Sequence, residues 1–172
     1  YERQLTGILV AANHSDIKSI EQLEGKRVDF PSPNALGASL YMRTLLSRQF
    51  YVECEPKFVE THESVYLNVI SGKAAAGGGV RRTLEAQSPE IQEQLRVIYE
   101  TPGVAPHPIA YHPRVPKEVV AKVKAAIIEM AKTEDGKTLL AGIPMTAPGN
   151  ATKEDYQPLV DLKLEEFYQA PE

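Results

Sequence analysis

The stretch from residue 27 to 40, RVDFPSPNALGASL, combines a short apolar run, a turn of small polar residues and the start of a helix. Val28 and Phe30 are typical of the end of a buried strand, and Pro31 and Pro33 prevent its continuation as a central strand. The first N–H groups of a helix have no partner within it and carry partial positive charge, so they attract anions. The turn therefore predicts an anion site, although any strand-to-helix turn of an α/β domain has a similar appearance.

Three consecutive glycines mark a second candidate, within AAAGGGV at residues 74–80. Each glycine costs about 0.5–1 kcal/mol relative to alanine in a helix or strand, so a run of three suggests close approach of backbone to backbone or to a ligand. We expect a helix to begin directly afterwards, which makes Gly77 and Gly78 candidate ligand contacts at a helix entry. A flexible loop is the alternative. No GxxxxGK[ST] pattern follows, so this is not a nucleotide P-loop.

Single side chains supply the remaining candidates. Arg81 can offer a bidentate charge to an oxyanion, whereas Arg43 stands about two turns into its helix and is expected to be too far from the turn. Tyr41 and Tyr66 could donate hydroxyl groups, but their helical spacing is more typical of the edge of a core. His62 near a helix start is, on sequence alone, more typical of a cap or a surface residue. Paired glutamates such as Glu60 and Glu63 are assigned to solvated helix faces.

Composition excludes several classes of function. The 172 residues carry a net charge of −4 without a basic stripe, which gives no support to nucleic-acid binding. The single Cys54 excludes an internal disulfide, and the four histidines lack the spacing of metal ligands. No apolar run approaches transmembrane length. We expect no metal, no cofactor and no catalytic residue.

Apolar periodicity predicts strands alternating with helices over the first 110 residues and helices after that. This pattern indicates an α/β fold with a mostly parallel central sheet flanked by helices, plus C-terminal helices. The expected strands lie at 5–12, 26–30, 57–59 and 95–99, with a short addition at 109–111. The expected helices lie at 20–23, 37–50, 61–71, 80–84, 90–94, 116–132, 136–141 and 152–168, with a kink or break near Pro158.

Three segments together resemble a known family: LEGKRVDFPSPNALGASLYMRTLL, FVETHESVYLNVISGKAAAGGGVRRTL and LRVIYETPGVAPHPIAYHPRVP. Their order and spacing are similar to the phosphonate-type periplasmic solute-binding proteins, which are type 2 binding proteins that serve ABC importers of phosphonate, phosphite and phosphate. The resemblance implies two lobes that close over a ligand, of which this chain lacks most of the first. It implies a ligand-binding lobe with crossover strands over 1–112 and, over 113–172, helices that pack on the other lobe. The first residue, Tyr1 rather than Met, also suggests a piece of a longer protein.

The resemblance places the family's anion-binding turn at residues 31–39. Members place a cluster of Ser and Thr hydroxyls there, and here those positions hold residues without hydroxyls: Asn34, Ala35, Leu36 and Gly37. The site would then depend on backbone N–H groups, helped by Ser32, Asn34 and Ser39. The family's Gly-Ser-His segment matches residues 60–62, which implies that His62 lies in the cleft. An acidic position that holds a ligand amine in some members falls at Ala75, which disfavours an aminoalkylphosphonate.

These features predict a binding module rather than an enzyme. It would capture a small anion in the periplasm or another extracytoplasmic place, free or membrane-anchored, and pass it to an ABC transporter permease. A divergent sensing domain fused to a membrane histidine kinase or cyclase is the first alternative. A hydrolase or transferase using His62 is the second, without a nucleophile elbow or cofactor motif to support it. The third is a fragment that binds nothing alone and forms a homodimer through the face its other lobe would cover.

Overall fold

A computed structural model describes residues 4–143 and 148–170. The chain divides into two compact units, which are described separately. One consists of residues 4–105 together with the last segment from Tyr156 onward, and it contains every strand of the described chain. The other is formed mainly by residues 106–155. The candidate site lies entirely in the first unit, which we call the lobe.

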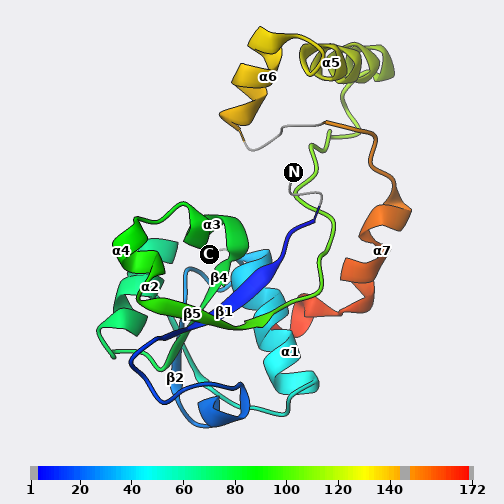
Figure 1. The fold of residues 1–172 in the computed structure, drawn as a ribbon. Coiled ribbons are helices and arrows are strands. Elements are labelled where there is room, and N and C mark those ends of the chain that lie inside the picture. The colour runs from blue at the N-terminus through cyan, green and yellow to red at the C-terminus, as the bar shows by residue number, and fades with distance from the viewer. Residues whose placement is uncertain (1–3, 144–147, 171–172) are drawn as a thin grey trace. The chain divides into compact units, whose positions relative to one another are not determined.

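The lobe is built on a five-stranded sheet with the strand order β3-β2-β4-β1-β5 (Figure 1). Its strands are β1 (Gly7–Ala12), β2 (Arg27–Phe30), β3 (Glu55–Phe58), β4 (Ala76–Val80) and β5 (Leu95–Glu100). Strand β2 pairs in parallel with β3 and β4, and β1 pairs antiparallel with β4 and β5. Four strands therefore run in one direction and β1 runs against them. This confirms the predicted α/β class with helices flanking a central sheet, but the sheet is mixed, because both pairings of β1 are antiparallel.

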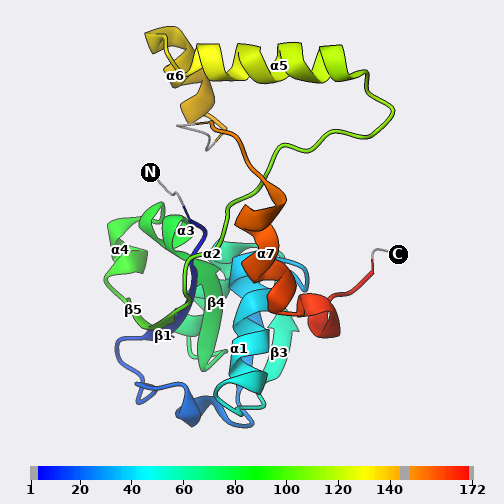
Figure 2. The same cartoon turned by 90° about the vertical axis from the view of Figure 1, so that its right-hand side faces the viewer.

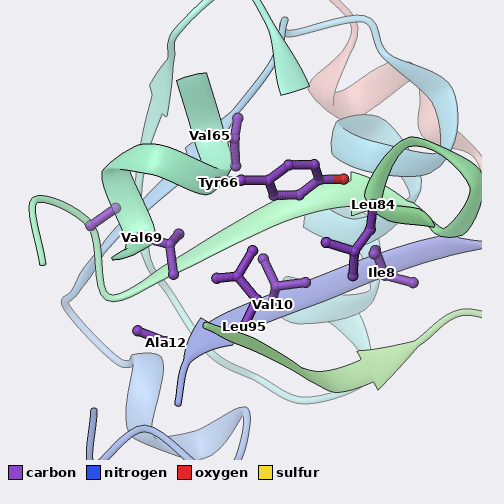
Figure 3. Packing of buried hydrophobic residues seen from close by; sticks show 9 residues of the cluster. Ile8, Val10, Ala12, Val65, Tyr66, Val69, Leu84 and Leu95 are labelled. Carbon is purple, nitrogen blue, oxygen red and sulfur yellow. The ribbon is translucent and has the colours of Figure 1, made fainter. Parts of the chain in front are cut away.

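Helices cover both faces of this sheet. They are η1 (Glu21–Leu23), η2 (Leu36–Tyr41), α1 (Met42–Arg48), α2 (His62–Ile70), α3 (Arg81–Glu85) and α4 (Pro89–Gln92). Because side chains alternate along a strand, Ile8 and Val10 of β1 pack with α2 on one face, while Leu9 packs with α1 on the other. Figure 3 shows the first of these clusters, with Tyr66 lying across the sheet beside Val65.

The glycine run forms a central strand, which was not expected, and the helix expected directly after it begins at Arg81. Residues Gly77–Gly79 are buried in β4 and pair with β1. A Cβ on Gly78 would lie closer than 3.0 Å to the carbonyl oxygen of Ala38 and to the Phe30 ring, and one on Gly79 equally close to the Tyr66 hydroxyl. The glycines therefore allow helices to approach the strand closely from both faces, which is the backbone-to-backbone alternative that the run suggested.

The helix expected at 37–50 begins as a π-helix, η2, and continues as α1. The carbonyl oxygen of Ala35 accepts from the N–H of Ser39 at 2.8 Å and from that of Leu40 at 3.0 Å. This shared acceptor marks the wider first turn. Short π-helical turns within helices are rare and are frequent at functional sites.

The last segment of the chain packs on the lobe beside α1. The expected helix at 152–168 is instead divided into α7 (Lys153–Asp161), which continues through Pro158, and η3 (Leu164–Phe167). The break falls at Lys163, which has a left-handed backbone with φ of 49°. Figure 2 shows η3 in red next to α1 in cyan.

The second unit contains the helices α5 (Lys117–Met130) and α6 (Glu134–Ala141). The Thr133 hydroxyl caps α6 by accepting from the N–H of Gly136 at 3.1 Å. The short strand expected at 109–111 is not formed. None of the helices in the described parts of the chain is long and apolar enough to cross a membrane. The predicted packing of residues 113–172 on another lobe stays a prediction.

Candidate functional site

Three helices of the lobe begin at one edge of the sheet. Because β2, β3 and β4 are parallel, their carboxyl ends lie at this edge, and the chain passes from them into η2, α2 and α3. The start of β1 and the end of β5 lie there too, since β1 runs in the opposite direction. In α/β sheets ligands bind outside the carboxyl ends of the strands, so this edge is where a site is expected.

The turn over residues 31–39 consists of a loop, residues 31–35, and the start of η2. Its backbone N–H groups at the start of the helix could bind an anion. The N–H groups of Leu36, Gly37 and Ala38 precede the first bond of the helix, which Ser39 donates to Ala35. Ser39 is fully buried, and its Oγ has no hydrogen-bond partner in the described structure. A buried hydroxyl without a partner is uncommon and calls for an explanation, such as a ligand or a water molecule.

Packing holds this turn against the start of β1. A Cβ on Gly7 would lie closer than 3.0 Å to the carbonyl oxygen of Gly37, and a Cβ on Gly37 would lie 3.1 Å from Val80. The N–H of Gly7 donates to the Thr101 hydroxyl at 2.9 Å, which joins β1 to the end of β5. Gly37 is therefore packed against the start of β1 and the end of β4, and the bond between Gly7 and Thr101 links β1 in turn to the end of β5.

Asn34 uses its side chain to hold the last segment of the chain. Its Nδ2 donates to the carbonyl oxygen of Gln169 at 2.6 Å, and its Oδ1 accepts from the N–H of Gln169 at 2.9 Å. Both polar ends of the amide are thus engaged. Ser32, at the start of the same turn, accepts from the N–H of Ala35 through its carbonyl at 3.4 Å.

His62 is the first residue of α2, directly after Thr61, whose hydroxyl caps the helix by accepting from the N–H of Ser64 at 3.0 Å. The imidazole is half-buried, and its buried Nδ1 has no hydrogen-bond partner in the part of the chain described. Its ring lies 6.4 Å from that of Tyr66. Burial lowers the pKa of His62 below its ordinary value of 6.5, so the ring is neutral at pH 7.

The lowered pKa of His62 predicts a pH dependence of stability. Below about pH 6.5 the unfolded state takes up the proton before the folded state does, so folding stability is complete above that pH and decreases as the pH falls. Urea unfolding of the wild type and His62→Gln between about pH 7.5 and 5.5 measures this effect. We expect the wild type to lose more stability than His62→Gln over this range. Equal losses would show that His62 titrates normally, and His14→Gln, which changes an exposed histidine, serves as control.

Gly77, Gly78 and Arg81 are arranged differently from a ligand-binding set. The space a side chain would need at Gly77 is filled by Val65 and Val69, and the space at Gly78 by Ala38 and Phe30. Arg81 does begin a helix at the site edge, but its guanidinium forms an ion pair with Glu100 at the end of β5. Gly77 and Gly78 thus have a packing role in this structure, and a ligand contact of Arg81 stays a prediction.

Arg43 was expected to lie too far from the turn over residues 31–39, but its side chain contacts this turn at Pro33. Its Nη2 donates to the carbonyl oxygens of Pro33 and Phe167, both at 2.8 Å. The sequence held a signal for this contact: Arg43 follows Leu40 by three residues, on the apolar face of the helix, where a charged side chain is unusual. Tyr66, by contrast, is a buried core residue whose hydroxyl bonds Thr83 at 2.8 Å, as the core interpretation of its spacing implied.

The described residues contain no group of three or more His, Cys, Asp or Glu side chains that could hold a metal ion. The groups at the edge include backbone N–H donors, hydroxyls and one neutral imidazole. Such donors suit an oxyanion.

Over residues 2–156 the chain matches the model of one family, described as the periplasmic substrate-binding protein of phosphonate ABC transporters, and it belongs to that family. A binding protein component of an ABC phosphonate transporter from Pseudomonas aeruginosa has the same fold, with a TM-score of 0.80 and 17% identity over 96% of this chain and 59% of that one. PhnD1 from Prochlorococcus marinus, solved with methylphosphonate, gives 0.73 and 18% over 96% and 68%. A Xanthomonas citri protein solved with chloride gives 0.79 and 12% over 96% and 66%.

The chain thus spans about three fifths to two thirds of the length of these structures. At such low identities the likeness concerns the fold alone. No curated protein matches the sequence.

Proposed function

We propose that the chain binds a small oxyanion of the phosphonate, phosphite or phosphate class at the turn over residues 31–39, as part of a substrate-binding protein for ABC import. The observation that carries this proposal is the group of N–H donors at Leu36, Gly37 and Ala38, which precede the first bond of the helix. Oxyanions bind well to such donors because the helix dipole adds to the hydrogen bonds. Family membership supports the transport role.

Two more groups extend the proposed site. Ser39 offers a buried hydroxyl without a partner in the described structure, and His62 offers a neutral imidazole at the neighbouring helix start. A neutral imidazole has one N–H donor and one acceptor, so it can bond an oxyanion or a protonated ligand oxygen. In the proposed protein a second lobe completes the cleft, and closure presents the ligand to a permease outside the cytoplasm.

The proposal is tested by thermal unfolding and isothermal titration of the chain with a panel of anions. The panel contains inorganic phosphate, phosphite, methylphosphonate, 2-aminoethylphosphonate, sulfate, methanesulfonate and acetate. At about 100 times its dissociation constant a ligand stabilises the folded state by roughly 2.7 kcal/mol, a shift of several degrees. We expect a phosphorus oxyanion to give the largest shift. Ala75, where the resemblance placed the residue that holds a ligand amine, lies before the start of β4 and so at the other edge of the sheet, and 2-aminoethylphosphonate tests whether an added amine changes binding. A panel without any stabilising anion would contradict the proposal.

A further inference from the structure

Arg43 is a buried charge that forms no ion pair with the residues that the structure describes. Its side chain extends from α1 to the turn before η2, and the residue is only 8% exposed. The guanidinium lies between two aromatic rings, 5.2 Å from the centre of Phe58 and 5.1 Å from that of Phe167. Its hydrogen-bond acceptors are the carbonyl oxygens of Pro33 and Phe167, and its buried Nε has no partner in the described structure. All these contacts are with uncharged groups.

Other arginines of the lobe have ion-pair partners or contact with water. Arg27, Arg48 and Arg81 each form an ion pair with a carboxylate. Arg96 also donates only to uncharged oxygens, but it is partly exposed to water and lies at the opposite edge of the sheet, at the loop after β1. Burial lowers the pKa of Arg43, which shows the cost of holding this charge away from water. Among the described residues, Arg43 is therefore a buried cation at the site edge without an anionic partner.

Buried charges in proteins are normally paired, because an unpaired one costs several kcal/mol of desolvation. The carbonyl that Arg43 holds belongs to Pro33, in the turn that leads to the N–H donors at Leu36, Gly37 and Ala38. An anion at those donors would therefore lie on the same turn as the guanidinium. In a buried environment the attraction between two such charges is much larger than in water.

We propose that Arg43 is a positioning residue of the anion site, which shapes the turn through the carbonyl of Pro33 and whose buried charge is balanced by the bound anion. This inference rests on the proposed function and adds to it the source of the site's positive charge. It also makes the segment around Phe167 part of the site's support, since that segment supplies the second carbonyl and one of the two rings. A clamp with a structural role only would need the shape of Arg43 and not its charge.

Three variants separate these roles, with methylphosphonate as the probe and titration calorimetry as the measurement. Arg43→Gln removes the charge, and Arg43→Lys keeps it while changing the shape. Arg48→Gln is the matched control, because Arg48 is on the same helix and binds Glu166 and Leu162 of the same last segment but is 42% exposed. We expect Arg43→Gln to weaken binding about tenfold or more, Arg43→Lys to restore most of the loss, and Arg48→Gln to bind within about twofold of the wild type.

Other outcomes would overturn the inference. Wild-type affinity in Arg43→Gln would exclude any role, equal losses in Arg43→Gln and Arg43→Lys would leave a structural clamp only, and an equal loss in Arg48→Gln would indicate a general effect of charge. These outcomes concern the role of Arg43 alone as long as the wild type binds methylphosphonate. If the wild type bound no anion of the panel, the proposed function itself would fail.

A second measurement on the wild type does not depend on how well the variants fold. The Nε–H resonance of Arg43 should be visible by NMR, because that group is buried. We expect a saturable shift of this resonance when methylphosphonate is added, and none for the Nε–H of Arg96. An unchanged Arg43 resonance at saturating ligand would contradict the proposal.

Discussion

Replacing Gly78 with alanine is expected to lower the free energy of unfolding by about 3 kcal/mol. The added methyl group would lie closer than 3.0 Å to the backbone carbonyl of Ala38 and to the ring of Phe30. The carbonyl belongs to η2 and cannot rotate away as a flexible side chain could, so the helix would have to move off β4. Urea unfolding followed by circular dichroism measures the change.

Gly149→Ala is the matched control for this substitution. Nothing lies within 4 Å of the position its Cβ would take, and its backbone has no positive φ. We expect its stability to stay within about 0.5 kcal/mol of the wild type. Similar stabilities of the two variants would mean that η2 does not pack on β4 as closely as described.

Truncation of Tyr66 to alanine should cost about 3–5 kcal/mol, the usual effect of removing a large buried aromatic side chain. Tyr66 is fully buried between α2 and the sheet, where Figure 3 shows it in the cluster with Val65 and Leu84. The Tyr66 side chain fits against β4 because residue 79 is a glycine, since a side chain at that position would collide with the Tyr66 hydroxyl. The loss is measured by the same urea unfolding.

Tyr66→Phe separates the ring from the hydroxyl. It keeps the packing and removes only the hydrogen bond to Thr83, so we expect a loss of about 1 kcal/mol. Because the hydroxyl is bonded within the core, methylphosphonate should bind this variant as it binds the wild type. A large loss of affinity in a stable Tyr66→Phe would instead make the hydroxyl a ligand contact.

Local patterns predicted the positions of most strands and helices of the lobe, since each depends on neighbouring residues. The continuous apolar run over β1 and the prolines after Phe30 are examples. The helix after the glycine run was predicted, but the run itself was not recognised as a strand because its reason is not local: Ala38, Val65 and Tyr66 come from helices elsewhere in the chain and pack against the strand. Propensity alone cannot distinguish a glycine required by such packing from a glycine in a loop.

The candidate site was predictable in part. The turn and His62 lie at helix starts at one edge of the sheet, as their spacing after strands suggested. The position of Arg43 two turns into its helix was misleading, because the long side chain reaches back to the carbonyl oxygen of Pro33. Its second acceptor belongs to Phe167, which is distant in sequence. The engagement of Asn34 by Gln169 could not be foreseen for the same reason.

The most direct test of the account is an NMR titration of the backbone amides with methylphosphonate. The account predicts saturable shifts at the N–H groups of Leu36, Gly37 and Ala38, a smaller shift at His62, and none along α6. Saturable shifts confined to other parts of the chain, or no saturable shift at all, would show that the turn over residues 31–39 is not an anion site.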